Sequence, residues 1–464
     1  MIQLGLHDIA EAVGGRLIGK DLLVTGSIET DSRLVTAGSL FVCKPGEVTD
    51  GHNFAQSAID GGAVALVVEG ELDVDAPQIL VGDAVLALGR LAADVLRRVR
   101  AKSTLQVIGI TGSNGKTSTK NMLREILQNS GQTIAPIESY NNEVGAPISI
   151  LKIDHLTKYL VVELGAGGVG SIEYLAKIAK PDIGVLLKVG LAHAGEFGGI
   201  ETTLKIKSEL VRELGPAATL VFNSDDALVA STTALTTAHL LSFGTGDEAQ
   251  VRIEDPELSL EGTRANIVFA DGTSESINLQ ILGEHQLMNA AASLAVAEVL
   301  GLNRKASIAA LEKMKLAERW RMQLGVRADG VFVINDAYNA SPDSMKAALQ
   351  TLAQLGRQGH RTIAVLGEMA ELGEFSAVEH DAMGRLAVRL NIDQVVVVGV
   401  GAKLIHMGAS QEGSWDGESK YFDSIDEALV ALRGMLEPGD VVLVKSSKSA
   451  NLRHLGDDLM EVSI

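Results

Sequence analysis

From Leu105 onward, short apolar segments alternate with amphipathic segments of helical period. The expected strands of this region are LQVIGI, YLVVEL, IGVLLK and ATLVF, and the expected helices include Thr117–Asn129 and ETTLKIKSELVREL. Alternation of strand and helix indicates a mostly parallel sheet with helices on both faces. A less regular segment, RANIVFA, is typical of an antiparallel edge, and EHQLMNAAASLAVAEVLG is expected to form a long helix.

The alternation resumes after about residue 320, with expected strands GVFVIN, RTIAVLG, DQVVVVG and DVVLVK. The first hundred residues instead contain short strands and turns, followed by the helical stretch AVLALGRLAADVLRRVR. A chain of 464 residues has room for roughly two to four domains. We predict an α/β fold of three domains: a small N-terminal α/β domain (1–104), a central doubly wound sheet of the P-loop ATPase kind (105–318) and a C-terminal Rossmann-like α/β domain (319–464).

The chain is strongly acidic, with 40 basic and 59 acidic side chains and a net charge of −19. A uniformly acidic surface repels nucleic acid and anionic membranes, so we expect neither as a partner. If the substrates are also anions, they need local cationic pockets or helix N-termini that overcome this field.

The cysteine content and the N-terminal residues indicate the compartment. Cys43 is the only cysteine, so no intrachain disulfide can form, as expected in a reducing environment. The first residues, MIQLGLHDIAEAVGG, lack the basic start of a signal peptide. No apolar run approaches the ~18 residues that a membrane span needs. We therefore expect a soluble, cytoplasmic protein with no membrane insertion.

The most informative local motif is GITGSNGKTS, which lies between an expected apolar strand and an expected helix. This is the context of a phosphate-binding loop, in which Gly112 and Gly115 let the backbone approach phosphate oxygens. Lys116 would balance phosphate charge and Thr117 would bind Mg²⁺. The strict Walker pattern is not met, because Ile110 stands where it requires glycine. The alternative is a glycine-rich turn without a ligand.

The segment TGSNGKT resembles the nucleotide loop of the Mur ligase family. The resemblance implies that ATP is bound by the residues of this loop: Thr111, Gly112, Ser113, Asn114, Gly115, Lys116, Thr117 and Ser118. Further segments follow in family order, from about Asp31 to Leu452. Their joint order is far more specific than any single motif.

The resemblance also implies metal ligands downstream of the loop. In the family, a glutamate in the context of VVELGAGG helps to bind magnesium, which here is Glu163. His193 and Lys207 match a His…Lys-x-Glu arrangement in which a carbamylated lysine and the histidine hold a second Mg²⁺. Taken separately, the histidine could be a satisfied loop residue and the lysine a surface residue. Lys205 points to another helix face and is the poorer candidate.

Four more residues match the nucleotide site of the family. Asn289, in GEHQLMNAAASLAVA, matches an asparagine that recognises adenine, and His285 matches too, although Gln286 stands where the family usually has asparagine. Arg321 matches an arginine near the γ-phosphate, with Trp320 in place of a more usual glycine. Asp336 matches a nucleotide-contacting aspartate; a strand-end aspartate can also simply cap a helix.

The N-terminal motifs match the UDP-sugar domain of the family. Ser32 and Arg33 offer donors for a pyrophosphate. Asp50, Gly51 and His52 form the second motif of this domain. Asn142, in YNNEVGAP, is a further expected contact to the sugar-peptide.

Two segments, NASP at 339–342 and VLGEMAELGEFSAVEHDAMG at 365–384, resemble the branch of the family that adds D-alanyl-D-alanine, as does VKSSKSANL at 444–452. This implies an ATP-dependent ligase that joins D-alanyl-D-alanine to UDP-N-acetylmuramoyl-tripeptide through an acyl phosphate. The implied cofactors are ATP and two Mg²⁺ ions, and the expected working unit is a monomer.

Several alternatives stay open. One is a sibling ligase that adds a single amino acid; the diaminopimelate-adding sibling carries an Asn-Pro dipeptide that this chain lacks. Folylpolyglutamate synthases share the loop but begin close to it. An alternative of another class is a nucleotide-dependent binding protein without ligase activity.

Overall fold

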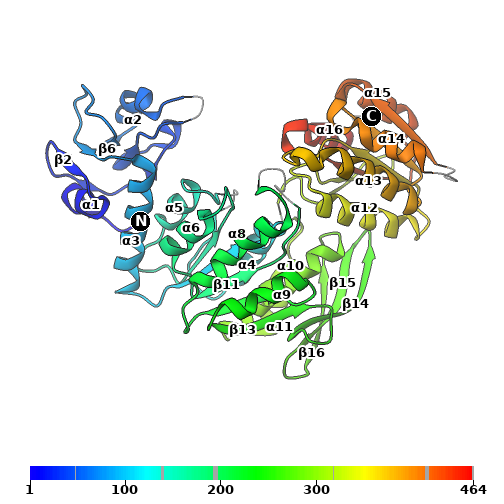
Figure 1. Cartoon of the computed structure of the whole chain (residues 1–464), viewed down its shortest axis with the longest axis horizontal. Coiled ribbons are helices and arrows are strands. Elements are labelled where there is room, and N and C mark those ends of the chain that lie inside the picture. The colour runs from blue at the N-terminus through cyan, green and yellow to red at the C-terminus, as the bar shows by residue number, and fades with distance from the viewer. Residues whose placement is uncertain (47–48, 137–139, 192–196, 317, 413–416, 462–464) are drawn as a thin grey trace.

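The computed structural model describes residues 1–46, 49–136, 140–191, 197–316, 318–412 and 417–461. Within these residues, three large β-sheets follow one another along the chain, each covered by helices (Figure 1). The predicted α/β class with three domains is confirmed, with sheets that are mixed rather than purely parallel. The predicted boundaries at 104/105 and 318/319 stay predictions.

The N-terminal sheet has the strand order β2-β7-β6-β5-β4, in which only β2 runs antiparallel to its neighbour. Its strands are β2 (Arg16–Ile18), β4 (Ile28–Glu29), β5 (Ser39–Val42), β6 (Ala63–Val68) and β7 (Gln78–Leu80), with a separate pair β1 (Leu4–Gly5) and β3 (Leu23–Val24). The helices are α1 (Leu6–Val13), α2 (Ala55–Asp60) and α3 (Ala84–Arg100), with 3-10 turns η1 (Ser32–Leu34) and η2 (Gly51–Phe54). Helix α3 has the bounds of the predicted helical stretch, because its apolar face is buried along its whole length.

The central sheet has the order β16-β15-β14-β13-β12-β11-β8-β10-β9. Its strands are β8 (Gln106–Thr111), β9 (Thr133–Ile134), β10 (Tyr159–Glu163), β11 (Ile183–Leu186), β12 (Thr219–Asn223), β13 (His239–Gly244), β14 (Val251–Ser259), β15 (Gly262–Phe269) and β16 (Ser274–Leu279). The strands from β9 to β14 pair in parallel, and β15 and β16 form the predicted antiparallel edge.

Helices of the central part are α4 (Lys116–Leu127), α5 (Gly145–Ile150), α6 (Ser171–Ala179), α8 (Ile200–Glu213), α9 (Ala227–Ser231), α10 (Glu284–Val299) and α11 (Arg304–Glu312). Strand β8 lies between β10 and β11, and the chain continues from β10 to the other side of β8. The carboxyl end of β8 is therefore a topological switch point, where ligands of open α/β sheets bind.

The C-terminal sheet has the order β17-β18-β22-β19-β20-β21, with only β17 antiparallel. Its strands are β17 (Gln323–Val326), β18 (Phe332–Asn335), β19 (Thr362–Leu366), β20 (Gln394–Val398), β21 (Glu418–Phe422) and β22 (Val441–Lys445). The helices are α12 (Pro342–Gly356), α13 (Ser376–Arg389), α14 (Lys403–Gln411), α15 (Ile425–Met435) and α16 (Leu452–Met460). Among the described helices, none combines the length and the apolar character that a membrane crossing requires.

Candidate active site

The predicted phosphate loop connects β8 to α4 at the switch point. Its backbone is left-handed at Gly115, with φ at 87°, and Gly112 also has a positive φ of 154°. A Cβ atom on Gly115 would come within 2.5 Å of the Asn289 side-chain oxygen, so only glycine fits there. The hydroxyl of Thr111 donates to the Leu164 carbonyl at 2.8 Å and fixes the end of β8. The loop thus presents the N-terminus of α4, which is a site for an anion.

Lys116 is half-buried at the first position of α4, and its ammonium donates to the Gly112 carbonyl across the loop at 2.6 Å. Burial lowers the pKa of this lysine; the Glu163 carboxylate opposes that shift and the Arg321 guanidinium adds to it. The fold therefore holds a desolvated cation over the loop. A phosphate group at this place would supply the negative charge that the ammonium needs.

Glu163 ends β10 beside the loop, and its side chain is buried. One carboxylate oxygen accepts from the Thr117 hydroxyl at 3.3 Å, and the other lies 3.0 Å from the Lys120 ammonium. A hydroxyl and a carboxylate side by side are the oxygen ligands that Mg²⁺ prefers, so these two residues fit the metal. The sequence interpretation included Thr117 and Glu163 but missed Lys120.

Lys207 is 2% exposed on α8, whereas Lys205, two residues earlier, is exposed to solvent. Burial lowers the pKa of Lys207 well below its usual value; repulsion from Lys116 lowers it further and Glu209 opposes the shift. The carboxylate of Glu209 accepts from backbone amides at the start of α6, from Gly170 at 2.7 Å among others, so this glutamate caps a helix. His193 lies outside the described residues, and its pairing with Lys207 stays a prediction.

A cavity of about 420 Å³ lies between the phosphate loop and the C-terminal part. It brings together predicted residues from both parts of the chain: Ser113, Asn114, Gly115, Lys116, Thr117, Ser118, Glu163, His285, Asn289, Arg321 and Asp336. It also contains residues that the sequence interpretation did not assign, among them Asn141, Lys188, Tyr338, Asp343, Glu371, Lys445 and Lys448. Thr111 and Lys207 are not among its described lining residues.

On the C-terminal wall of this cavity, Asp336 is held by two partners. Its carboxylate lies 2.6 Å from the Lys445 ammonium and accepts from the Met322 backbone at 3.0 Å. Lys445 is 1% exposed at the end of β22. Arg321 stacks its guanidinium over the Tyr338 ring at 4.5 Å. These contacts place a fixed carboxylate and a fixed guanidinium opposite the phosphate loop.

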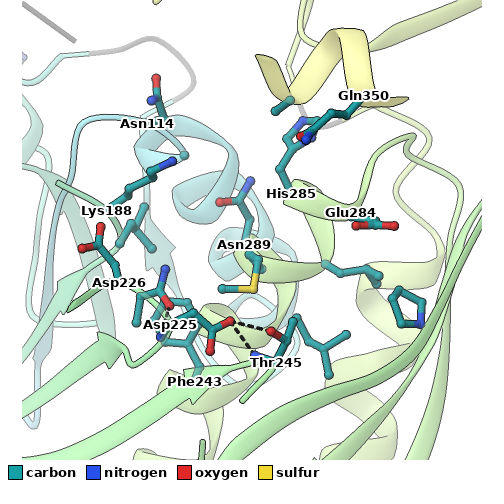
Figure 2. A pocket seen from close by; sticks show the side chains of 18 of the residues that line it. Asn114, Lys188, Asp225, Asp226, Phe243, Thr245, Glu284, His285, Asn289 and Gln350 are labelled. Carbon is teal, nitrogen blue, oxygen red and sulfur yellow. Dashed lines mark hydrogen bonds between the residues drawn. The ribbon is translucent and has the colours of Figure 1, made fainter. Parts of the chain in front are cut away.

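A second cavity of about 660 Å³ adjoins the first, and Figure 2 shows it. Asn114, Gly115 and Asn289 line both cavities, and the second has apolar side chains that include Phe243 and Leu287. The Asn289 amide donates to the Gln286 side chain at 3.0 Å and accepts from the Thr119 hydroxyl at 3.3 Å. Asn289 therefore ties α10 to the phosphate-loop helix as well as facing the cavity.

Trp320 precedes Arg321, which lines the smaller cavity. Its backbone is left-handed, with φ at 59°. This conformation favours glycine, which explains the more usual residue at this position of the family. The indole N–H donates to both Asp457 carboxylate oxygens at 2.9 and 3.0 Å, and the ring stacks on Tyr338. Asp457 of α16 and the ring of Tyr338 together hold the tryptophan in place.

The N-terminal motifs follow the adjacent parallel strands β4 and β5, so both lie at one edge of the N-terminal sheet. Asp31 accepts from the Arg33 guanidinium at 2.6 Å and Asp50 accepts from the His52 ring at 2.6 Å. Hydrogen bonds from Arg33 lower the pKa of Asp31 to about 2. Ser32, Arg33, Asp50, Gly51 and His52 are not among the described residues that line the two cavities. Figure 1 shows this part on the far side of the central sheet from the C-terminal part.

Asn142 is exposed, and its side-chain oxygen accepts from the Val144 and Gly145 backbone at 3.3 and 2.8 Å. It closes a turn just before α5, and its neighbour Asn141 is the residue that lines the smaller cavity. A contact of Asn142 with a sugar-peptide stays a prediction.

Comparison with known proteins covers the whole chain. Residues 25–103 match the Mur ligase family catalytic domain, residues 110–297 the Mur ligase middle domain, and residues 320–448 the Mur ligase glutamate ligase domain. Proteins named UDP-N-acetylmuramoyl-tripeptide--D-alanyl-D-alanine ligase are similar: that of Mycobacterium tuberculosis is 40% identical over 99% of this chain and 98% of its own. That of Bacillus subtilis is 32% identical over 99% of both chains.

Solved structures of similar proteins have the same fold along nearly the whole chain. A crystal structure of MurF from Acinetobacter baumannii covers 100% of both chains with a TM-score of 0.90 and 31% identity. A MurF ligase from Thermotoga maritima in complex with ADP covers 94% of this chain and 97% of its own, with a TM-score of 0.82 and 30% identity. The resemblance that the sequence motifs indicated is thereby confirmed: this chain belongs to the Mur ligase family of ATP-dependent peptide ligases.

Proposed function

We propose that the protein joins D-alanyl-D-alanine to UDP-N-acetylmuramoyl-tripeptide, forming an amide bond as ATP is converted to ADP and phosphate. One observation carries the proposal. The phosphate loop, the Thr117–Glu163 pair and the cavity facing Arg321 occur in a chain that aligns end to end with ligases of this name. A nucleotide-binding protein without ligase activity would need none of the further charged groups around the cavity.

The nucleotide occupies both cavities in this proposal. The base and ribose enter the larger cavity beside Asn289, where apolar side chains accept a flat ring. The phosphates lie at the N-terminus of α4, near the Lys116 ammonium. Magnesium would be held by Thr117 and Glu163, and when bound it neutralises charge on the phosphates.

The reaction then has two steps. The terminal carboxylate of the tripeptide attacks the γ-phosphorus and ADP leaves, which gives an acyl phosphate. The neutral amine of the dipeptide attacks the acyl carbon, the amide bond forms, and phosphate leaves. Lys116 and Arg321 offset the repulsion between the two anions in the first step, because both cations line the cavity.

Lys207 is proposed to be carbamylated. Carbamate forms when a neutral amine attacks CO₂ and loses a proton, and burial favours the neutral amine by lowering the pKa of this lysine. The product is an anion with oxygen ligands, which suits a second Mg²⁺ shared with His193. The buried ammonium that would otherwise repel Lys116 is then removed.

The working unit is proposed to be a monomer in the cytoplasm. Both walls of the nucleotide cavity come from one chain, so no second subunit is needed to complete them. The single Cys43 is buried and free, as suits a reducing compartment that also supplies ATP.

A phosphate-release assay tests the activity. UDP-muramoyl-tripeptides ending in diaminopimelate or lysine are combined with ATP, Mg²⁺ and D-alanyl-D-alanine, D-alanine or L-alanine. We expect phosphate release only with a tripeptide and the dipeptide together. Equal turnover with a single amino acid would instead indicate a sibling ligase, and nucleotide binding without any turnover would indicate a binding protein.

A further inference from the structure

We propose that Trp320 is a positioning residue for Arg321, an assignment that rests on the proposed function. Arg321 lines the smaller cavity, whereas Trp320 is not among its described lining residues. The tryptophan would therefore act on a ligand only through its neighbours. Its ring orients the ring of Tyr338, and that ring supports the guanidinium of Arg321.

The guanidinium of Arg321 is supported in a way that leaves its N–H groups to a ligand. It lies over the Tyr338 ring, with its central carbon 4.5 Å from the ring centroid. An aromatic face attracts a planar cation without engaging its hydrogen-bond donors. The Nε of this arginine is buried and has no hydrogen-bond partner among the described residues. The direction of the guanidinium therefore depends on the plane of the tyrosine ring.

Tyr338 is held by Trp320 through both its ring and its backbone. The two rings are stacked, with centroids 6.5 Å apart and an angle of 25° between their planes. The backbone amide of Tyr338 donates to the Trp320 carbonyl at 3.2 Å. In a stacked pair, each ring limits the tilt of the other. Loss of the indole would therefore let the tyrosine ring turn, and the guanidinium of Arg321 with it.

Trp320 is held in turn by Asp457 on α16. The indole N–H donates to both carboxylate oxygens, at 3.0 and 2.9 Å. The same carboxylate accepts from the Arg319 guanidinium at 3.0 Å and from the Asn335 amide at 3.1 Å. Asn335 is the last residue of β18. One carboxylate thus joins β18 to the segment that carries the cavity arginine, and the tryptophan is anchored on its far side.

The backbone of this segment argues against a merely space-filling tryptophan. Trp320 has a φ of 59°, a left-handed conformation that is strained for a residue with a side chain and unstrained for glycine. Met322, two positions later, also has a positive φ, of 49°. A strained residue persists where its contacts offset the strain. Because glycine suits this backbone better, we expect the indole to serve the side chains that it touches.

The test is a double-mutant cycle on the full-length protein, measured as turnover at saturating ATP, UDP-muramoyl-tripeptide and D-alanyl-D-alanine. Arg321→Ala should lower turnover about 10²-fold, because a cation beside the transferring phosphate is lost. Trp320→Gly should lower it about tenfold, because the cation remains but is misplaced. If the tryptophan acts through the arginine, the double variant should be no slower than Arg321→Ala. Independent roles would multiply, to a loss of about 10³-fold.

A second set of measurements separates positioning from damage to the site. Trp320→Phe keeps a stacked ring and should keep turnover within about threefold of the wild type. The Kd for ADP should change less than about twofold in Trp320→Gly, because ADP lacks the phosphate on which Arg321 is proposed to act. Asn391→Gly is the matched control: Asn391 is exposed, has a φ of 56° and is not among the described lining residues of either cavity. Its turnover should equal that of the wild type.

Four outcomes would overturn the assignment. They are wild-type turnover in Trp320→Gly, wild-type turnover in Arg321→Ala, multiplied losses in the double variant, and a Kd for ADP in Trp320→Gly that rises as much as turnover falls. The last would indicate general damage to the nucleotide site. Absence of ligation by the wild-type protein is a different result, because it would contradict the proposed function itself.

Discussion

The two expected anion sites of this chain are built in opposite ways. At the N-terminal edge, Arg33 and His52 pair with acids two positions away, and Arg33 has an 86% exposed side chain. Around the phosphate loop, Glu163, Lys207 and Lys445 are buried, and the contacts join distant parts of the chain. From this difference we expect the first site to attract a ligand from solvent, and the second to hold desolvated charges in place for chemistry.

The sharpest way to break this comparison is Lys116→Ala. If the desolvated charge serves phosphoryl transfer, turnover should fall by about 10³-fold. Thermal unfolding should stay near that of the wild type, because burial lowers the pKa of Lys116 and the fold does not stabilise its charge. Near-normal turnover in this variant would refute the assignment of the loop.

The next test separates a buried from an exposed lysine on α8. Lys207→Ala should lose about 10²-fold in turnover, and a small added carboxylate should restore part of it by entering the vacated space. Lys205→Ala, the matched control, should change turnover by less than about twofold. Carbon NMR with ¹³CO₂ should give a carbamate signal in the control and none in Lys207→Ala. Full activity of Lys207→Ala would leave the carbamate without a role.

A smaller effect is expected at the exposed site. Arg33→Ala should raise the KM for the UDP-muramoyl-tripeptide about tenfold, because one charged hydrogen-bond donor to a pyrophosphate is lost. The turnover number and the KM for ATP should not change. Arg16→Ala is the control, an exposed arginine on β2 of the same part of the chain. A fall in the turnover number of Arg33→Ala would mean that this site also acts in catalysis.

The smallest effect concerns stability against pH. Burial lowers the pKa of His285 from 6.5 to about 4; Asp336 opposes the shift and Lys445 adds to it. Between pH 6.5 and 4 the unfolded chain binds a proton that the folded chain does not, so stability is full above pH 6.5 and falls as the pH drops toward 4. Because His285 is only half-buried, we expect a loss of about 1–2 kcal/mol, below the full value of the shift. Unfolding midpoints of His285→Gln should fall less steeply over this range; an identical slope would contradict the assignment.

Local features of the fold could be predicted from the sequence. The helix Ala84–Arg100 has a continuous apolar face, and the loop between β8 and α4 is a contiguous motif that is followed directly by its helix. The antiparallel edge could also be predicted, because the segment RANIVFA departs from the regular alternation of strand and helix that precedes it. These signals lie within one element or within two neighbouring elements.

The lysine partners of Asp336 and Glu163 could not be predicted from the sequence, and the reason is physical. Lys445 is 109 positions from Asp336, and the two meet only because β22 inserts between β18 and β19. Lys120 reaches Glu163 because β10 pairs directly with β8, a strand order that hydrophobic periodicity does not specify. The roles of Asn141 and Asn142 depend on which neighbour closes a turn and which faces the cavity.

The smaller cavity has walls from two sheets, joined near the phosphate loop by Lys188 with Asp343 at 2.8 Å and by Ser341 with Asn114 at 3.2 Å. A ligand that contacts both walls stabilises the arrangement in which these contacts join the two walls. Thermodynamic linkage then requires reciprocity: the factor by which the nucleotide favours the joined arrangement equals the factor by which that arrangement tightens the nucleotide. Every substitution that weakens the contact between the sheets is therefore expected to lower the affinity for ATP as well, even where the substituted residue lies far from the phosphates.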